Sequence, residues 1–255
     1  MESAILWIEA LKSALFGVVE GITEWLPISS TGHMLLLNQF LPLNVSEDFW
    51  NMFLVVIQLG AILAVCVGFF HKLNPFSPKK SREEKRSTWK LWAKVVVSCV
   101  PAAAIGLPLN DFIEEHLGSP FVIAATLIFY GIIFILLELH REKVAATAKV
   151  EIPRGKHMRS DATSSRKAPS ADDLARVKDI DNLDWKTALG IGVFQVLAIV
   201  PGTSRSGATI LGGLALGCSR AVAAEFTFFL AIPTMAGASA LRLVRYFMKG
   251  NTFTT

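Results

Sequence analysis

Long apolar runs constrain this chain more than any other feature of its sequence. Residues 49–70 contain no Asp, Glu, Lys or Arg, and residues 91–109 and 120–139 contain one charged residue each. About 20 such residues are enough to cross a bilayer as an α-helix. Hydrophobic residues make up 52% of the 255 positions and charged residues only 18%. These runs predict an all-α polytopic membrane protein rather than a soluble domain.

Basic residues gather in two segments beside the apolar runs, at 71–90 and 140–186. Two spans separate these segments, so both lie on one side of the membrane. The bias of Lys and Arg toward cytoplasmic loops makes that side the cytoplasm, and the short acidic turn expected at 110–118 then faces outward. The segment 140–186 is polar throughout and predicts a flexible loop, at least around 160–173. Topology and anionic membrane lipids explain the net charge of +4, so no nucleic acid partner is expected.

Two apolar stretches are interrupted by short polar sequences. EGITEWLPISSTGH, at 20–33, follows the apolar residues 4–19 and precedes a second short apolar piece, and PGTSRSGAT, at 201–209, interrupts the stretch 187–217. Two half-length helices joined at Pro, Ser and Gly residues predict a re-entrant hairpin rather than a complete crossing. Broken backbone at membrane depth is tolerated only where protein or a water-filled cavity covers it, so both breaks are expected to line a cavity.

The two interrupted stretches resemble each other. A shift of 175 positions pairs Ser29 with Ser204 and places Glu20 opposite Gln195. Broken helices in corresponding positions point to a binding site between repeats. If one hairpin enters from outside and the other from the cytoplasm, the repeats are inverted and their polar tips meet near the midplane. The helix after the second hairpin then ends on the outer, less basic side.

Glu20 and Glu24 lie four residues apart, on one face of a helix, in otherwise apolar surroundings. Two carboxylates this close repel each other unless a cation or a shared proton lies between them. Hard oxygen ligands suit Mg²⁺ or Ca²⁺, and both ions bridge carboxylate and phosphate oxygens. The alternative is that both side chains reach water at a membrane edge.

The residues after the first break offer candidate catalytic groups. His33 is either a hydrogen-bonded structural residue or, beside two carboxylates in a cavity, a nucleophile or general acid or base, since histidine titrates near neutral pH. Ser29, Ser30 and Thr31 either cap the following helix or include an activated nucleophile. The sequence alone leaves these alternatives open.

The second break carries one charge, Arg205. Its planar guanidinium suits bidentate phosphate binding. The hydroxyls of Ser204, Ser206 and Thr209 add donors, and backbone N–H groups at a helix start favour an anion. An ion pair between Arg205 and the carboxylates of the first break is the purely structural alternative. The combined prediction is that carboxylates, a metal ion and Arg205 together hold a phosphate-bearing molecule.

Two regions of the sequence resemble those of a known family. EGITEWLPISSTGHM and FQVLAIVPGTSRSGATI closely resemble the two signature regions of the bacterial undecaprenyl-diphosphate phosphatases of the bacitracin-resistance type, and VVIQLGAILAV and AAEFTFFLAIPTMAGA are similar to further stretches. The resemblance covers most of the chain from residue 10 to about 245, apart from the polar loop. It implies hydrolysis of undecaprenyl diphosphate to undecaprenyl phosphate and phosphate. This reaction recycles the lipid carrier for peptidoglycan synthesis, cell wall biogenesis and cell shape, and gives bacitracin resistance.

The resemblance also implies roles for individual residues. Glu20 and Glu24 match the acidic pair tied to a divalent cation, Mg²⁺ or Ca²⁺, and Glu24 also to catalysis. Ser30 and His33 match the Ser and His of the first signature, and either of them, or a metal-bound water, attacks the phosphorus. The expected phosphate-binding positions are Ser29, Ser204, Arg205, Ser206 and Thr209, with Arg205 also catalytic.

The implied architecture is a single integral membrane domain over residues 1–255, built from inverted repeats with two re-entrant helical hairpins. The first repeat spans about 4–139, the polar cytoplasmic loop spans 140–186, and the second repeat spans about 187–255. Family members continue for about two more apolar segments, so the second repeat is expected to be incomplete and the C-terminus shortened. The resemblance places the protein in the bacterial inner membrane with an outward-facing active site, and leaves a homodimer open.

Two other functions suit parts of this pattern. A prenyl-phosphate transporter or flippase without hydrolysis is the main alternative, because broken helices at a repeat interface suit transport as well as catalysis. An ion channel or carrier is the third, but it leaves the joint occurrence of Arg205, two carboxylates and His33 unexplained.

Overall fold

All regular structure in the described part of the chain is helical. The computed structural model describes residues 2–117, 119–148 and 170–252, and the only β-type pairing within them is an isolated bridge between Val177 and Cys218. This confirms the prediction of an all-α polytopic membrane protein. Four helices within this part are long and apolar enough to cross a membrane, at 47–68, 82–109, 120–148 and 220–248.

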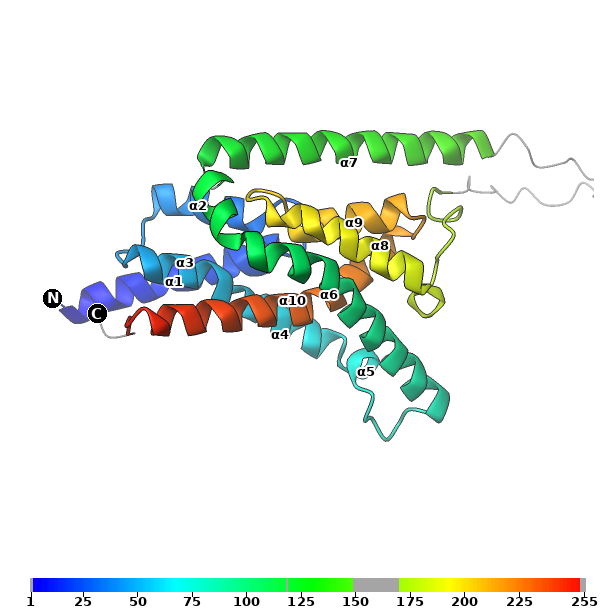
Figure 1. Cartoon of the computed structure of the whole chain (residues 1–255), viewed down its shortest axis with the longest axis horizontal. Helices are drawn as coiled ribbons and strands as arrows, with labels where there is room; N and C mark the ends of the chain where they lie inside the picture. Colours follow the sequence, from blue (N-terminus) through cyan, green and yellow to red (C-terminus); the bar gives the residue numbers. More distant parts are fainter. Residues whose placement is uncertain (1, 118, 149–169, 253–255) are drawn as a thin grey trace, which may run out of the picture.

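The first half of the chain forms seven helices within the described residues, and α7 lies along one edge of the molecule (Figure 1). The uncharged run predicted as a single span is divided at Ile57 into two helices, α3 and α4. In chain order the helices are α1 (Glu2–Thr23), α2 (Ser30–Phe40), α3 (Glu47–Val56), α4 (Gln58–Gly68), α5 (Phe70–Leu73), α6 (Arg82–Leu117) and α7 (Pro120–Ala148).

The second half contains a broken helix followed by one long helix. α8 ends in a 3₁₀ turn before the polar break, and α9 begins directly after it. The elements described here are η1 (Ile180–Asn182), α8 (Trp185–Gln195), η2 (Val196–Ile199), α9 (Arg205–Ala215) and α10 (Arg220–Met248).

Two predicted boundaries differ from the structure. The prediction of a turn at 110–118 was wrong, because α6 continues through both of its prolines to Leu117. One local contact that supports this last turn is Phe112 stacked on His116 four residues later, with 4.3 Å between ring centroids. The helix α7 likewise continues past residue 139 to Ala148, because a helix that leaves the membrane can go on in water with polar residues. The flexible segment expected around 160–173 falls largely on residues 149–169, outside the described residues.

The part of the polar loop that is described is tied to the helices by ion pairs. Asp172 accepts hydrogen bonds from Arg141 at 3.0 Å and from Arg220 at 3.0 Å. Asp184 caps α8 by accepting the Thr187 N–H. The hydrogen-bonded guanidinium of Arg176, together with that N–H, holds the pKa of Asp184 below its ordinary value. Residues 170–184 therefore have a fixed position at this end of the molecule.

Both polar breaks form helical hairpins that match the proposed repeat. The 175-residue shift carries α2 (Ser30–Phe40) onto α9 (Arg205–Ala215) without a change of length. Each helix is capped by the serine before it, Ser29 or Ser204, whose Oγ accepts a backbone N–H three residues on. In Figure 1, α1 runs inward from one end of the molecule and α8 from the other. These observations support an internal repeat whose halves run in opposite directions.

The hydrophobic core lies around the first half of α10. Phe226, Phe229 and Leu230 are fully buried there and belong to one cluster with Ile191 of α8 and Val95 of α6. This arrangement fixes α10 against the second hairpin, which positions the polar break at 201–204.

The helices α6 and α8 approach each other closely at Gly192. The Ser98 hydroxyl donates to the Ala188 carbonyl oxygen at 2.6 Å, so a side chain of α6 is bonded to the backbone of α8. A Cβ on Gly192 would overlap the Ser98 carbonyl oxygen and lie 2.7 Å from its Cα. Small residues allow this kind of backbone approach between membrane helices.

We expect Gly192→Ala to destabilise the protein by about 1 to 3 kcal/mol or more, because backbone atoms must move to admit the methyl group. The matched control is Gly131→Ala in α7, where an added Cβ meets nothing within 4 Å. Thermal unfolding in detergent measures both. Equal melting temperatures for the two variants would contradict the close packing of α6 on α8.

Candidate functional site

The tips of the two hairpins meet and enclose a cavity of about 210 Å³. Its lining comes from both breaks, from the start of α4 and from the middle of α10. The predicted site residues among them are Glu24, Ser29, Ser30, Ser204 and Arg205. The complete lining in the described residues is Glu24, Ser29, Ser30, Thr31, Gln58, Ala198, Thr203, Ser204, Arg205, Thr234, Met235 and Ala238.

An ion pair joins the two tips across this cavity. Arg205 Nη2 lies 2.8 Å from Glu24 Oε1, and the two side chains are 12% and 6% exposed. Arg205 Nη1 also donates to the Thr227 carbonyl oxygen at 3.4 Å, which fixes the plane of the guanidinium. Removing one partner of a buried ion pair leaves an uncompensated charge and costs about 3 to 5 kcal/mol. The pair therefore holds both hairpins in place while its charges border the cavity.

A second contact joins the tips beside the ion pair. The Ser206 hydroxyl donates to the Leu26 carbonyl oxygen at 3.2 Å. On the far side, the Thr126 hydroxyl of α7 lies 3.0 Å from the Pro201 carbonyl oxygen. Gly202, at φ 89°, admits the close approach of α7, because a Cβ there would lie 2.8 Å from Ile123 Cα. The second tip is thus held between the first tip and α7.

Ser30 lines the cavity and its hydroxyl is hydrogen-bonded to a carboxylate, an arrangement that suits a nucleophile. Its Oγ donates to Glu24 Oε2 at 2.5 Å, so the carboxylate that pairs with Arg205 through one oxygen holds the Ser30 proton through the other. Ser29, directly before it, has φ 62°, and no other non-glycine residue in the described part of the chain has a positive φ. Such backbone strain costs about 1 to 3 kcal/mol and is common at active sites. The strained turn aims Ser30 at Glu24 and into the cavity.

Glu20 lies one turn before Glu24 and is only 1% exposed. Neither of its carboxylate oxygens has a hydrogen-bond partner among the described residues. A buried carboxylate without partners is costly unless a proton or cation compensates it. Two carboxylates one helical turn apart provide hard oxygen ligands, and of the two only Glu24 is among the described residues that line the cavity. The donor set therefore suits the predicted Mg²⁺ or Ca²⁺.

His33 lies one turn into α2 and does not line the cavity. Its Nδ1 is 2.9 Å from the Ser29 carbonyl oxygen. A carbonyl oxygen can only accept, so Nδ1 is the donor in this contact. The histidine supports the strained Ser29 turn, and its predicted catalytic role stays a prediction.

The predicted phosphate-binding residues of the second tip divide into two groups. Ser204 and Arg205 line the cavity. Ser206 and Thr209 instead point into the protein. Thr209 is fully buried and accepts the Thr227 hydroxyl at 2.9 Å, while its own hydroxyl faces the Arg205 carbonyl oxygen at 3.0 Å. The sequence has these three hydroxyls and one charge in one segment, but the structure does not place them on one face of α9.

Both helices that follow the breaks begin at the cavity. Ser30 and Thr31 open α2, Arg205 opens α9, and all three line the cavity. The first N–H groups of a helix and its dipole favour an anion. Two such helix starts, together with Arg205, therefore favour an anion in this cavity.

Four polar residues near the site were not predicted from the sequence. Gln58, Thr203 and Thr234 line the cavity, and Gln195, buried beside them, has its Nε2 3.5 Å from the Thr234 hydroxyl. Gln58 and Thr234 are isolated polar residues in apolar spans, and Gln195 is the residue that the repeat register places opposite Glu20. These two signals could have identified three of the four.

Comparison with known proteins agrees with this geometry. The family model described as "Bacitracin resistance protein BacA" matches residues 13–255. The chain belongs to the BacA family. The resemblance inferred from the two signature regions is thereby confirmed, and both cavity-forming tips of this BacA family member lie inside the matched range.

Three similar relatives share the name undecaprenyl-diphosphatase. The undecaprenyl-diphosphatase of Streptococcus thermophilus (strain ATCC BAA-250 / LMG 18311) is 52% identical over 254 residues, which are 100% of this chain and 78% of the relative. The undecaprenyl-diphosphatase of Enterococcus faecalis (strain ATCC 700802 / V583) is 48% identical over 250 residues, 98% of this chain and 79% of the relative. That of Limosilactobacillus fermentum is 49% identical over 245 residues, 96% of this chain and 78% of the relative.

The position of Thr209 gives a test of its role. We expect Thr209→Val to lower the free energy of unfolding by about 1 to 3 kcal/mol, because the buried Thr227 hydroxyl loses its acceptor. The KM for a prenyl diphosphate should stay unchanged, and Thr209→Ser should keep most of the stability. Thermal unfolding and steady-state kinetics measure the two effects. A raised KM with normal stability would instead show the direct phosphate contact predicted from the sequence.

Proposed function

We propose that this protein hydrolyses undecaprenyl diphosphate to undecaprenyl phosphate and phosphate in the cavity between the two hairpin tips. The observation that carries this proposal is the arrangement of Ser30, Glu24 and Arg205 in one buried cavity at two helix starts, in a chain about half identical to relatives named undecaprenyl-diphosphatase. This reaction recycles the lipid carrier and gives bacitracin resistance.

The size of the cavity suits the head of the substrate rather than its tail. About 210 Å³ holds phosphate groups but not a 55-carbon chain. The prenyl tail would lie between helices or in the lipid. Arg205 and the starts of α2 and α9 bind the diphosphate and stabilise charge on the bridging oxygen, which is the main contribution of a protein to phosphoryl transfer.

The hydrogen bond from Ser30 to Glu24 supports a covalent route. The Ser30 oxygen attacks the terminal phosphorus, and its proton passes to Glu24 Oε2. The bond from this phosphorus to the bridging oxygen breaks, and undecaprenyl phosphate leaves. Water then hydrolyses the phosphoserine and releases phosphate, restoring the Ser30 hydroxyl. Glu20 and Glu24 would hold the predicted divalent cation, which when bound would neutralise part of the diphosphate charge.

We infer from the basic loops that the site of this multi-pass membrane protein opens outward from the bacterial inner membrane. A prenyl-phosphate transporter without hydrolysis is not favoured, because the relatives are named as phosphatases. The homodimer left open by the sequence stays a prediction.

Phosphate release by the purified protein tests the function. Wild-type protein in detergent should release phosphate from undecaprenyl diphosphate, and EDTA should abolish the release. Arg205→Ala should lower kcat/KM by at least about 10³-fold, since an arginine that stabilises the transferring phosphoryl group contributes on this scale. The control Arg86→Gln removes an exposed positive charge elsewhere and should keep full activity. Absence of release from folded wild-type protein would contradict the proposed function.

Acid-quench labelling tests the nucleophile. Substrate labelled on its terminal phosphate should leave label on Ser30 of the wild-type protein, and Ser30→Ala should lose both the label and activity, the latter by at least about 10³-fold. A parallel alkaline quench separates the alternative, because a phosphohistidine is lost in acid but survives in base, whereas a phosphoserine survives in acid. Label on His33, or an active Ser30→Ala variant, would contradict attack by Ser30.

A further inference from the structure

Buried polar side-chain atoms without a hydrogen-bond partner are few in this structure, and they are not scattered. Within the described residues there are five such atoms, two on Glu20 and one each on Gln195, Thr203 and Arg205. All four residues belong to the two hairpins. Buried polar groups are normally hydrogen-bonded, so each exception needs an explanation. A ligand held between the hairpin tips would give such atoms a partner.

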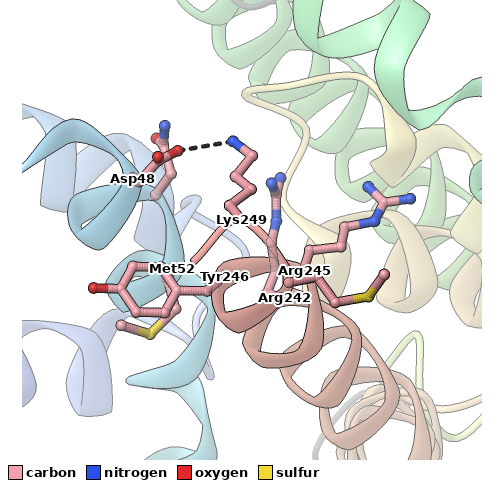
Figure 2. A pocket seen from close by; sticks show the side chains of 8 residues that line it. Asp48, Met52, Arg242, Arg245, Tyr246 and Lys249 are labelled. Carbon is pink, nitrogen blue, oxygen red and sulfur yellow. Dashed lines mark hydrogen bonds and ion pairs between the residues drawn. The ribbon is translucent and has the colours of Figure 1, made fainter. Parts of the chain in front are cut away.

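A larger cavity, of about 480 Å³, has none of these five atoms in its described lining. It lies between α3 and the end of α10, where Lys249 reaches toward Asp48 (Figure 2) with 2.9 Å between Nζ and Oδ1. Asn251 donates to the other oxygen of this carboxylate at 3.3 Å. Unpartnered buried atoms therefore distinguish the hairpin tips from this other cavity.

The second tip carries four hydroxyl groups, and those of its two serines are used within the protein. The Ser206 hydroxyl donates to the Leu26 carbonyl oxygen at 3.2 Å. Ser204 Oγ lies 3.1 Å from Ser206 Oγ, so Ser204 is the donor in that contact, and it also accepts the Gly207 N–H at 3.0 Å. Although Ser204 lines the cavity, its hydroxyl proton is not available to a ligand.

Thr203 differs from the other buried threonines of the described chain. Six are buried, and in five of them the hydroxyl donates a hydrogen bond: Thr23, Thr88, Thr187, Thr209 and Thr227. Thr203 is 8% exposed, and its Oγ1 has no partner within the described residues. Burial of an unpaired hydroxyl is costly. Because Thr203 lines the cavity, a ligand bound there can supply the partner.

The backbone around Thr203 is held on both sides. Its N–H donates to the Val200 carbonyl oxygen at 3.1 Å. The carbonyl oxygen of Pro201 accepts the Thr126 hydroxyl at 3.0 Å, and Ser204 directly after Thr203 caps α9. The position of this residue is therefore set before a ligand binds, which lowers the entropy lost on binding.

We propose that Thr203 is a substrate-contacting residue whose hydroxyl donates a hydrogen bond to a phosphate oxygen of the diphosphate. Ionised phosphate oxygens accept hydrogen bonds, and the Thr203 hydroxyl has a proton to donate. Arg205 Nε, two residues on, is a second unpartnered donor on the same tip. The inference rests on the proposed function in that the diphosphate is the ligand. Binding does not require turnover, so the two can fail independently.

Binding of farnesyl methylenediphosphonate, whose bridging carbon prevents hydrolysis, tests the proposal without turnover. Isothermal titration calorimetry is carried out on the detergent-solubilised full-length protein with Mg²⁺ present. Thr203→Val should raise the Kd about tenfold, since a hydrogen bond to a charged group contributes on this scale. Thr203→Ser keeps the hydroxyl and should bind nearly as wild type. The control Thr147→Val removes an exposed hydroxyl from α7 and should leave the Kd unchanged.

Thermal unfolding without the phosphonate separates a ligand contact from a structural role. Thr203→Val should melt at the wild-type temperature or above it, because it loses no hydrogen bond within the described protein and no longer buries an unpaired hydroxyl. The repeat register places the apolar residue Ile28 opposite Thr203, so the first tip forms without a hydroxyl at this position. A lowered melting temperature in Thr203→Val, with binding weakened equally in Thr203→Ser, would show a structural role and overturn the proposal.

Steady-state kinetics with undecaprenyl diphosphate distinguishes this inference from the proposed function. In Thr203→Val the KM should rise about tenfold while kcat changes little, as expected for a contact made equally in the ground state and the transition state. If wild type binds the phosphonate through Thr203 but releases no phosphate, the proposed function fails and this inference stands. If wild type hydrolyses the substrate and Thr203→Val has the wild-type Kd and KM, this inference alone is overturned.

Discussion

The buried ion pair between Glu24 and Arg205 is the contact on which the rest of this structure depends. It joins two segments 181 residues apart at the point where both helices are broken. In a membrane, backbone without regular hydrogen bonds must be covered by protein or must line a cavity, and a charge must have a partner. The ion pair gives each charge a partner, and both Arg205 and Glu24 border the cavity.

The similarity of the two breaks is consistent with a site that forms between two hairpins. Ser29 and Ser204 cap equivalent helices through the same hydrogen bond, so both helices begin at one cavity. The two tips differ in their charges. Glu20 faces Gln195 in the register and Arg205 corresponds to Ser30, which gives one tip the carboxylates and nucleophile and the other the cation. The two similar helix starts favour an anion, and the different side chains provide the candidate chemical groups.

The sequence predicted the spans, the breaks and the meeting of Glu24, Ser30 and Arg205, because intramembrane charges and hydroxyls are rare enough to be informative. It could not tell which hydroxyls of the second tip reach the cavity. Ser206 and Thr209 carry the same groups as Ser204, but the helix turns them toward a carbonyl and a neighbouring threonine. Gln58 and Thr234 were missed although each is an isolated polar residue in an apolar span, because the prediction relied on the clustered polar residues of the two breaks.

The central claim is that groups from both hairpins act as one site, and a kinetic double-mutant cycle tests it most directly. The quantity is kcat/KM for undecaprenyl diphosphate in wild type, Glu24→Gln, Arg205→Gln and the double variant. Groups that act as a unit are not additive, so the account predicts that the double variant loses no more than the worse single variant. Losses that multiply in the double variant would show that the two residues act independently, and would contradict a single site shared by both hairpins.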